Sequence, residues 1–204
     1  MAPLETPTGT RTVDWTTELS AQLDFHWRVH LRPRLAGLTD GELHWEPVPG
    51  CWGIRRRDQA TTPMAAGAGE WVADYAYPEP EPAPVTTIAW RLGHVTVGCL
   101  AKRAADHFGT GGVSYEATEW PATAEATLAR LDEAYEAWME PVRRLTPEEL
   151  AAPCGPAEGP WAAHPMAALV LHITREVVHH GAEVLLLRDL YRSAAGAALR
   201  GGTA

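Results

Sequence analysis

The segment HITREVVHHGAEVLLLRDLY, residues 172–191, places ionisable side chains at helical spacing within an otherwise apolar stretch. Glu176 and His180 stand four residues apart. On a helix they would lie about 6 Å apart along the axis and about 40° apart around it. A carboxylate and an imidazole held in this way can bind one divalent cation. The segment therefore predicts a helix that presents Glu176 and His180 on one face as metal ligands.

A third ligand must come from another part of the chain, and His94, in WRLGH at residues 90–94, is the best candidate. Two imidazoles and one carboxylate leave at least one coordination position open, which is typical of catalytic zinc and also suits nickel, iron or manganese. A cation with an open position lowers the pKa of a bound water or thiol. Each residue also has a plainer interpretation, because His94 alone fits a hydrogen-bonded core histidine and an ExxxH pair often occurs by chance.

Further histidines and tryptophans are candidates for a substrate pocket beside these ligands. Each has an alternative role in packing, since a tryptophan that closes a loop onto a helix buries a large apolar area. His179 would point about 100° away from His180, so we do not expect it to share the metal. The candidates are His26, Trp45, Trp52, Trp90, His172 and His179.

Four segments have a helical period of apolar residues, and together they predict an all-α fold, a four-helix bundle. Suitable N-caps are Asp14 or Thr12 for the first helix, Thr86 or Thr87 for the second and Thr123 for the third. Pro33 and Pro141 predict altered turns near two helix ends. We expect the fourth helix to end near Gly196. The predicted helices span residues 13–38, 87–108, 124–146 and 165–193.

The crossover between the first two predicted helices is long and rich in Pro, Gly and Trp. Residues 52–56 and 71–76 alternate enough to predict two short strands, which would form a small β-hairpin. The proline-rich stretch at residues 78–84 reads as an extended connector.

Composition narrows the possible partners and compartment. The chain has 204 residues and a net charge of −9, which argues against nucleic acid and anionic membranes as partners. No apolar run approaches the roughly 20 residues of a membrane span, and residues 1–6 lack the features of a signal peptide. The chain has three cysteines, an odd number, and they are widely spaced at Cys51, Cys99 and Cys154. We therefore expect no disulfide framework. We therefore expect a cytoplasmic protein, with Cys99 packed in the core.

Three blocks of sequence resemble the DinB superfamily: LTDGELHWEPVPGCWGIR at residues 38–55, TIAWRLGH at 87–94 and HHGAEVLLLRDLY at 179–191. The chain is most similar to the actinobacterial branch related to mycothiol-dependent maleylpyruvate isomerase. The resemblance implies one domain within residues 1–204, with a core at about 14–192. It further implies an up-down-down-up bundle and a divalent metal held by His94, Glu176 and His180.

The resemblance also implies a chemistry. Characterised members of the family are mostly thiol-dependent S-transferases and isomerases, so we expect mycothiol or another low-molecular-weight thiol as co-substrate and a small electrophile as substrate. Zinc is the favoured metal, and a homodimer is the implied assembly. Two alternatives stay open, namely a non-enzymatic stress protein that binds a metal or small ligand, and a metal-dependent hydrolase.

Overall fold

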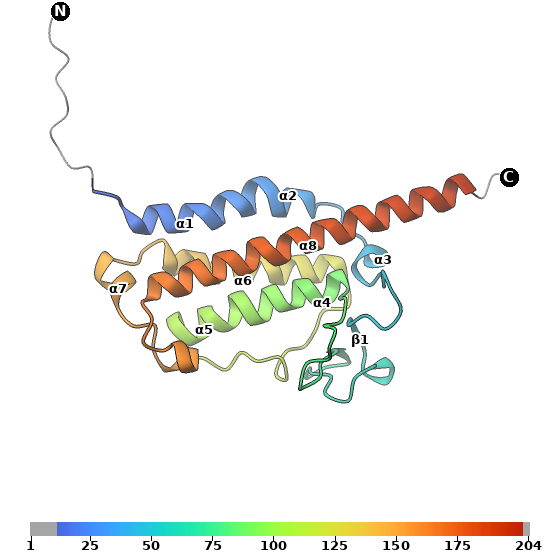
Figure 1. Cartoon of the computed structure of the whole chain (residues 1–204), viewed down its shortest axis with the longest axis horizontal. Helices are drawn as coiled ribbons and strands as arrows, with labels where there is room; N and C mark the ends of the chain where they lie inside the picture. The colour runs from blue at the N-terminus through green and yellow to red at the C-terminus, as the bar shows by residue number, and fades with distance from the viewer. Residues whose placement is uncertain (1–11, 202–204) are drawn as a thin grey trace, which may run out of the picture.

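Four helical rods dominate the computed structural model, which describes residues 12–201 (Figure 1). This confirms the predicted four-helix, all-α architecture. Two of the rods contain a π-helical stretch, so each of them is divided into three elements. The first rod is α1 (Trp15–Phe25), η1 (His26–Leu31) and α2 (Arg32–Arg34), the second is α4 (Ile88–Gly93), η3 (His94–Ala101) and α5 (Lys102–Phe108), the third is α6 (Ala124–Val142) and the fourth is α8 (Met166–Gly201).

The directions of the rods give the expected up-down-down-up order. In Figure 1, α1 and α8 run the same way, whereas the α4–α5 rod and α6 run the opposite way. Ion pairs agree with this view: Arg34 at the end of α2 pairs with Asp189 late in α8, and Arg32 pairs with Asp132 in the first half of α6. The first and last rods are therefore parallel neighbours.

The helix starts follow the capping residues that the sequence offers. The side chains of Asp14, Thr87 and Thr123 accept hydrogen bonds from Thr17 N, Trp90 N and Ala126 N, as predicted. Each cap satisfies a backbone N–H that has no partner within the helix.

Three helix ends differ from the prediction. The first rod ends at Arg34 and α6 at Val142, each four residues early. Just past each proline the chain tightens from i−4 to i−3 hydrogen bonds, since Ala36 N donates to Pro33 O and Arg144 N donates to Pro141 O. By contrast, α8 continues through Gly196 to Gly201. A helical glycine costs only about 1 kcal/mol relative to alanine, and the neighbouring alanines favour helix.

The crossover packs as a small cap that contains α3 (Asp40–Leu43), β1 (Ile54–Arg56), η2 (Arg57–Gln59) and β2 (Trp71–Ala73). The two strands pair antiparallel with Ile54 opposite Ala73, which confirms the predicted hairpin. The fully buried Asp74 organises the cap, because its carboxylate accepts from Gly53 N, Thr61 N and Arg55 Nε. Two short helices lie in the later loops, α7 (Pro147–Ala151) and η4 (Pro156–Trp161).

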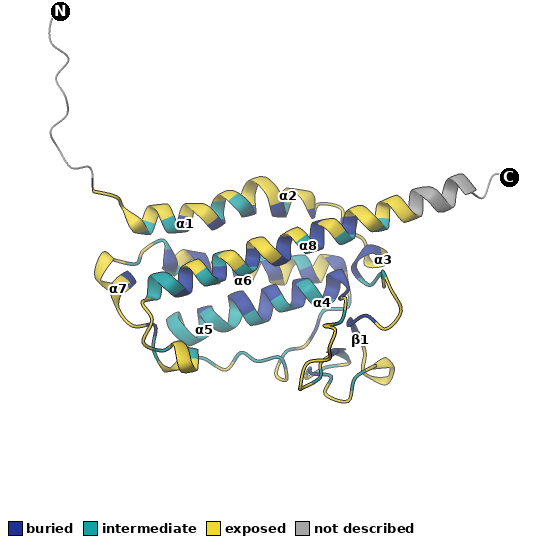
Figure 2. Cartoon of the chain, viewed as in Figure 1, coloured by how far each residue is buried: buried dark blue, intermediate teal, exposed yellow. Residues whose placement is uncertain are grey.

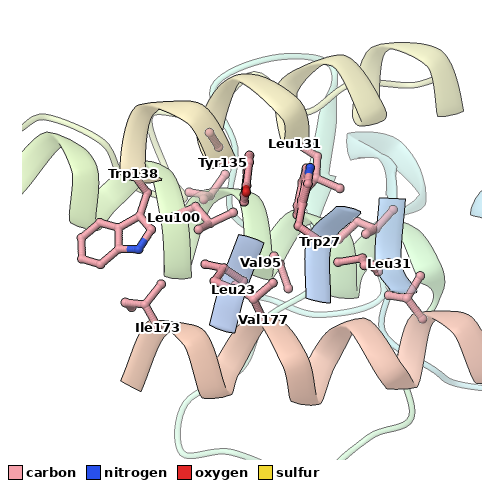
Figure 3. Packing of buried hydrophobic residues seen from close by; sticks show 14 of the residues in the cluster. Leu23, Trp27, Leu31, Val95, Leu100, Leu131, Tyr135, Trp138, Ile173 and Val177 are labelled. Atoms are coloured by element: carbon pink, nitrogen blue, oxygen red, sulfur yellow. The ribbon is translucent and has the colours of Figure 1, made fainter. Parts of the chain in front are cut away.

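The core fills the space between the four rods. Figure 3 shows Leu23 from the first rod near Val177 from α8, and Trp27 from the same rod beside Tyr135 from α6. The rings of Trp27 and Tyr135 stack with centroids 3.9 Å apart. In Figure 2, buried and exposed faces alternate along α8, as expected for a helix that covers a core on one side.

Within residues 12–201, none of the helices combines the length and apolarity that a membrane crossing requires. The expectation about a signal peptide concerns residues 1–6, which lie outside the described residues.

Candidate metal centre

His94, Glu176 and His180 meet between the second rod and α8, although His94 stands far earlier in the chain. One ligand atom from each residue lies within 4.8 Å of the other two. Glu176 Oε2 is 3.2 Å from His180 Nε2, and the two imidazole rings meet edge to face with centroids 4.8 Å apart. Neighbouring donors around a tetrahedral zinc ion are about 3.4 Å apart. The three side chains therefore fit a divalent cation after a contraction of about an ångström.

His94 occupies the first position of the π-helical stretch η3 and is held by neighbours on two sides. Its Nδ1 lies 2.8 Å from Tyr115 Oη, and its ring stacks on Trp90 with an interplanar angle of 13°. Burial is the main cause that lowers the pKa of His94 to about 4, and the neighbouring His180 and Arg91 act in the same direction. The imidazole is therefore neutral at physiological pH, which is the form that binds a metal.

His180 uses both ring nitrogens. Nε2 faces Glu176, whereas Nδ1 lies 2.8 Å from Glu183 Oε2, one turn farther along α8. Burial would raise the pKa of Glu183, but the hydrogen bond from His180 and the charge of Arg91 outweigh it and lower that pKa. An ionised Glu183 accepts a hydrogen bond from Nδ1–H, which leaves the lone pair of Nε2 free to bind a cation. Metal-binding histidines commonly have a carboxylate partner of this kind.

A second group of possible ligands, His179, His180 and Glu183, shares one histidine with the first. This group is less suited to a cation for two reasons. The His179 side chain is 65% exposed, and Arg91 Nε lies 2.8 Å from Glu183 Oε2, so a cation there would sit beside a guanidinium. No arginine or lysine of the described residues forms an ion pair with Glu176. The geometry therefore favours the first group.

Cys99 is a buried residue that lies beside the centre. Its Sγ is 3.5 Å from His94 Nε2, and burial, followed by the charge of Glu176, raises the pKa of the thiol to about 12. Cys99 is buried, at 4% exposure, as expected for a residue packed in the core, and it contacts His94 as well. Cys99 therefore adds a buried thiol on the His94 side of the group.

The candidate pocket residues lie at different distances from the centre. Trp90 stacks on His94 and Trp52 packs against Trp90, with centroids 5.8 Å apart in both pairs. His172 Nδ1 is 3.6 Å from Glu176 Oε1, and the exposed His179 packs edge-on against His180. Trp90, His172 and His179 therefore each contact a residue of the triad, whereas Trp52 reaches it only through Trp90.

Two of the candidate pocket residues do not contact the triad. Trp45 lies beside a later part of α8, and His26 lies against Gly181, next to His180 in the sequence. Trp45 packs edge-on against Tyr191, which lies about 16 Å beyond His180 along α8 at 1.5 Å per residue. His26 lies where η1 crosses α8, since a Cβ added to Gly181 would be 3.1 Å from His26 Nε2. Burial, followed by the charge of His30, lowers the pKa of His26.

The family model of the DinB superfamily matches residues 22–184. The chain belongs to the DinB superfamily. The match covers most of the chain and includes all three residues of the group, but it supports no particular branch of the superfamily. No curated protein and no solved structure matches the chain significantly.

Sequence reasoning missed the residues that hold the ligands in place. Glu183 follows His180 by three positions, so a search for a carboxylate one turn after each predicted ligand would have found it. Tyr115 lies in a loop after the second rod, and no sequence signal connects it to His94. Arg91 precedes His94 by three positions, which places both on neighbouring parts of one helix face.

Proposed function

We propose that this DinB protein is a metal-dependent enzyme that uses a low-molecular-weight thiol for S-transfer to, or isomerisation of, a small electrophile. The observation that supports the proposal is the three-donor group itself. It is built from two rods, and its carboxylate, Glu176, keeps 26% of its side chain exposed. A group of three protein donors with an accessible side is typical of catalytic rather than structural metal sites.

A divalent cation, with zinc as our first choice, would supply Lewis acidity and lower the pKa of a thiol bound to it. The residues of the chain supply orientation. Glu183 fixes the tautomer of His180, and Tyr115 holds His94 through Nδ1. Trp90 and Arg91 form a wall beside His94, since the Arg91 guanidinium lies 5.3 Å from the centre of the Trp90 ring.

The choice of thiol chemistry rests on resemblance. The mycothiol-dependent isomerase branch is similar in having a glutamate at the position of Glu176, where many members of the superfamily have histidine. We therefore propose mycothiol, or a related cellular thiol, as the co-substrate.

The position of Cys99 favours a second candidate, a metal-binding protein without catalytic activity. If Cys99 Sγ moved from His94 Nε2 to a cation, the site would have four protein donors and no open position. Closed sites of this kind are structural.

Cobalt(II) substitution separates the two candidates, because a thiolate bound to cobalt gives a charge-transfer absorption. We expect the cobalt protein to show no such band until mycothiol or glutathione is added, and the Cys99→Ser variant to behave in the same way. A band that exists before any thiol is added, and is lost in Cys99→Ser, would establish the closed site. No response to either thiol would contradict the enzymatic proposal.

A further inference from the structure

A pocket of about 490 Å³ opens between α5, the loop that contains η4, and the first turns of α8. Hydrogen bonds within the loop hold its outer wall in place. Cys154 N donates to His164 O, Gly155 N donates to Ala162 O, and Cys154 Sγ donates to Trp161 O at 3.3 Å. Trp161 is 63% exposed at the rim, and Leu169 forms part of the apolar wall.

The charges in this pocket do not cancel. Among the described residues that line it, Glu158 is the one carboxylate, and Glu158 Oε1 already lies 3.0 Å from Arg103 Nε and 2.9 Å from His107 Nε2. Arg175 also lines the pocket, and no carboxylate of the described residues lies within ion-pair distance of it. The pocket therefore has an uncompensated guanidinium, which favours an anionic ligand.

Arg175 fixes which ring nitrogen of His172 can donate a hydrogen bond. Its Nη2 lies 2.8 Å from His172 Nδ1. A guanidinium only donates, so Nδ1 must accept, and the proton of a neutral His172 is then on Nε2. Arg175 and His172 together offer several N–H groups to an anion.

Two lining residues connect the pocket to the candidate metal centre. His172 Nδ1 is 3.6 Å from Glu176 Oε1, and Arg103 Nη1 donates to Gly98 O at 3.4 Å, next to Cys99. The inner end of the pocket thus borders both rods that supply the triad. The end of the pocket that holds His172 and Arg175 is therefore the end nearest the three donors.

We propose that this pocket binds a small planar organic acid, with its carboxylate or sulfonate at Arg175 and His172 and its apolar body between Leu169 and Trp161. This inference deepens the proposed function, on which its catalytic meaning rests, by naming the class of substrate. Its carboxylate end would then be the end nearest the triad, because His172 lies beside Glu176 whereas Leu169 lies seven residues before Glu176 on α8. The binding itself needs neither the metal nor the thiol.

Calorimetry on the full chain tests the inference, with 2-naphthoate as the probe and the neutral 2-naphthamide as its comparison. We expect 2-naphthoate to bind more tightly than 2-naphthamide, and Arg175→Ala to weaken naphthoate about tenfold or more, since a hydrogen bond to a charged group contributes about 1.5–3 kcal/mol. Arg175→Lys should recover part of the loss. Trp161→Ala should weaken both probes.

Arg28→Ala is the matched control, because Arg28 is an exposed arginine on η1, outside the lining of this pocket. Equal naphthoate affinities in Arg175→Ala and Arg28→Ala, or no naphthoate binding to the unaltered chain, would overturn the inference. The measurement is made on both chelator-treated and zinc-loaded protein. Binding without any metal uptake would support the pocket while the proposed function fails, and metal uptake with no naphthoate binding would overturn the pocket alone.

Discussion

His180 is the residue on which the candidate centre depends most, because each of its ring nitrogens has a different neighbour. Nε2 faces Glu176 and Nδ1 faces Glu183. Spacing on one helix was enough to predict that Glu176 and His180 share a face. It was not enough to predict the role of Glu183, because that depends on which way the imidazole turns and on Arg91 from another rod.

Replacing Glu183 tests its role as a hydrogen-bond partner rather than a ligand. We expect Glu183→Ala to weaken zinc affinity about 10- to 100-fold, the usual cost of losing such a partner, and Glu183→Gln to cost less because its amide oxygen still accepts from Nδ1. Competition with a chromogenic chelator gives the affinity. Asp189→Ala is the matched control, since Asp189 is an exposed carboxylate on α8 that pairs with Arg34.

A loss in Glu183→Ala as complete as that in His180→Ala would contradict this role. It would instead identify Glu183 as a ligand and favour the competing group with His179.

At the scale of elements, glycines decide how closely the rods and loops approach the centre. A Cβ on Gly93 would lie 2.8 Å from the Trp120 ring and 2.9 Å from Ile54 Cδ1, so Gly93 lets the crossover pack against α4 beside His94. Gly181 has the same function where η1 meets α8. The sequence showed Gly93 and Gly181 beside His94 and His180. Only the packing shows that each glycine lets another segment approach its helix closely.

Gly98 controls the contact between η3 and the loop that contains Tyr115. A Cβ at Gly98 would lie 2.6 Å from Tyr115 Oη and 3.2 Å from His94 Nδ1. Alanine usually stabilises a helix by about 1 kcal/mol over glycine, but overpacking costs about 1–3 kcal/mol. We therefore expect Gly98→Ala to lower the free energy of unfolding and to weaken zinc affinity as Tyr115 moves from His94.

Urea unfolding and chelator competition measure the two effects of Gly98→Ala. Gly69→Ala is the control, because its added Cβ would meet only Glu119, at an ordinary 3.6 Å. An unchanged zinc affinity in Gly98→Ala would show that Tyr115 does not position His94.

The π-helical stretches are a further feature that the sequence showed only in part. Pro33 predicted an altered turn, and the structure has η1 directly before it, with Arg32 N donating to Trp27 O, five residues back. No proline accompanies η3, which begins at His94. Stretches of this kind often occur at functional sites, but their position depends on packing that a single helix sequence does not reveal.

At the scale of the whole molecule, a buried ion pair fastens the crossover to the bundle. Arg188 on α8 is 2% exposed, and its Nε donates to the buried Glu42 of α3 at 3.0 Å. The same guanidinium donates to Arg34 O and Ala36 O at the end of the first rod. The apolar periods predicted the four rods, but the sequence did not indicate that a charged residue late in α8 would be buried.

We expect Arg188→Ala to lower the free energy of unfolding by about 3–5 kcal/mol, because it leaves a buried carboxylate with fewer partners. Arg192→Ala is the matched control. Arg192 contacts the same Glu42 at 3.0 Å but is 55% exposed, so we expect a loss of about 1 kcal/mol or less. Equal losses in the two variants, measured by urea unfolding, would contradict the tie between crossover and bundle.

The central claim is that His94, Glu176 and His180 hold one metal ion, and zinc titration of the chelator-treated protein tests it most directly. We predict one tightly bound zinc per chain, with binding abolished in His94→Ala and in His180→Ala while circular dichroism shows the helices retained. Retention of one zinc in both variants, or no uptake by the unaltered protein, would contradict the account.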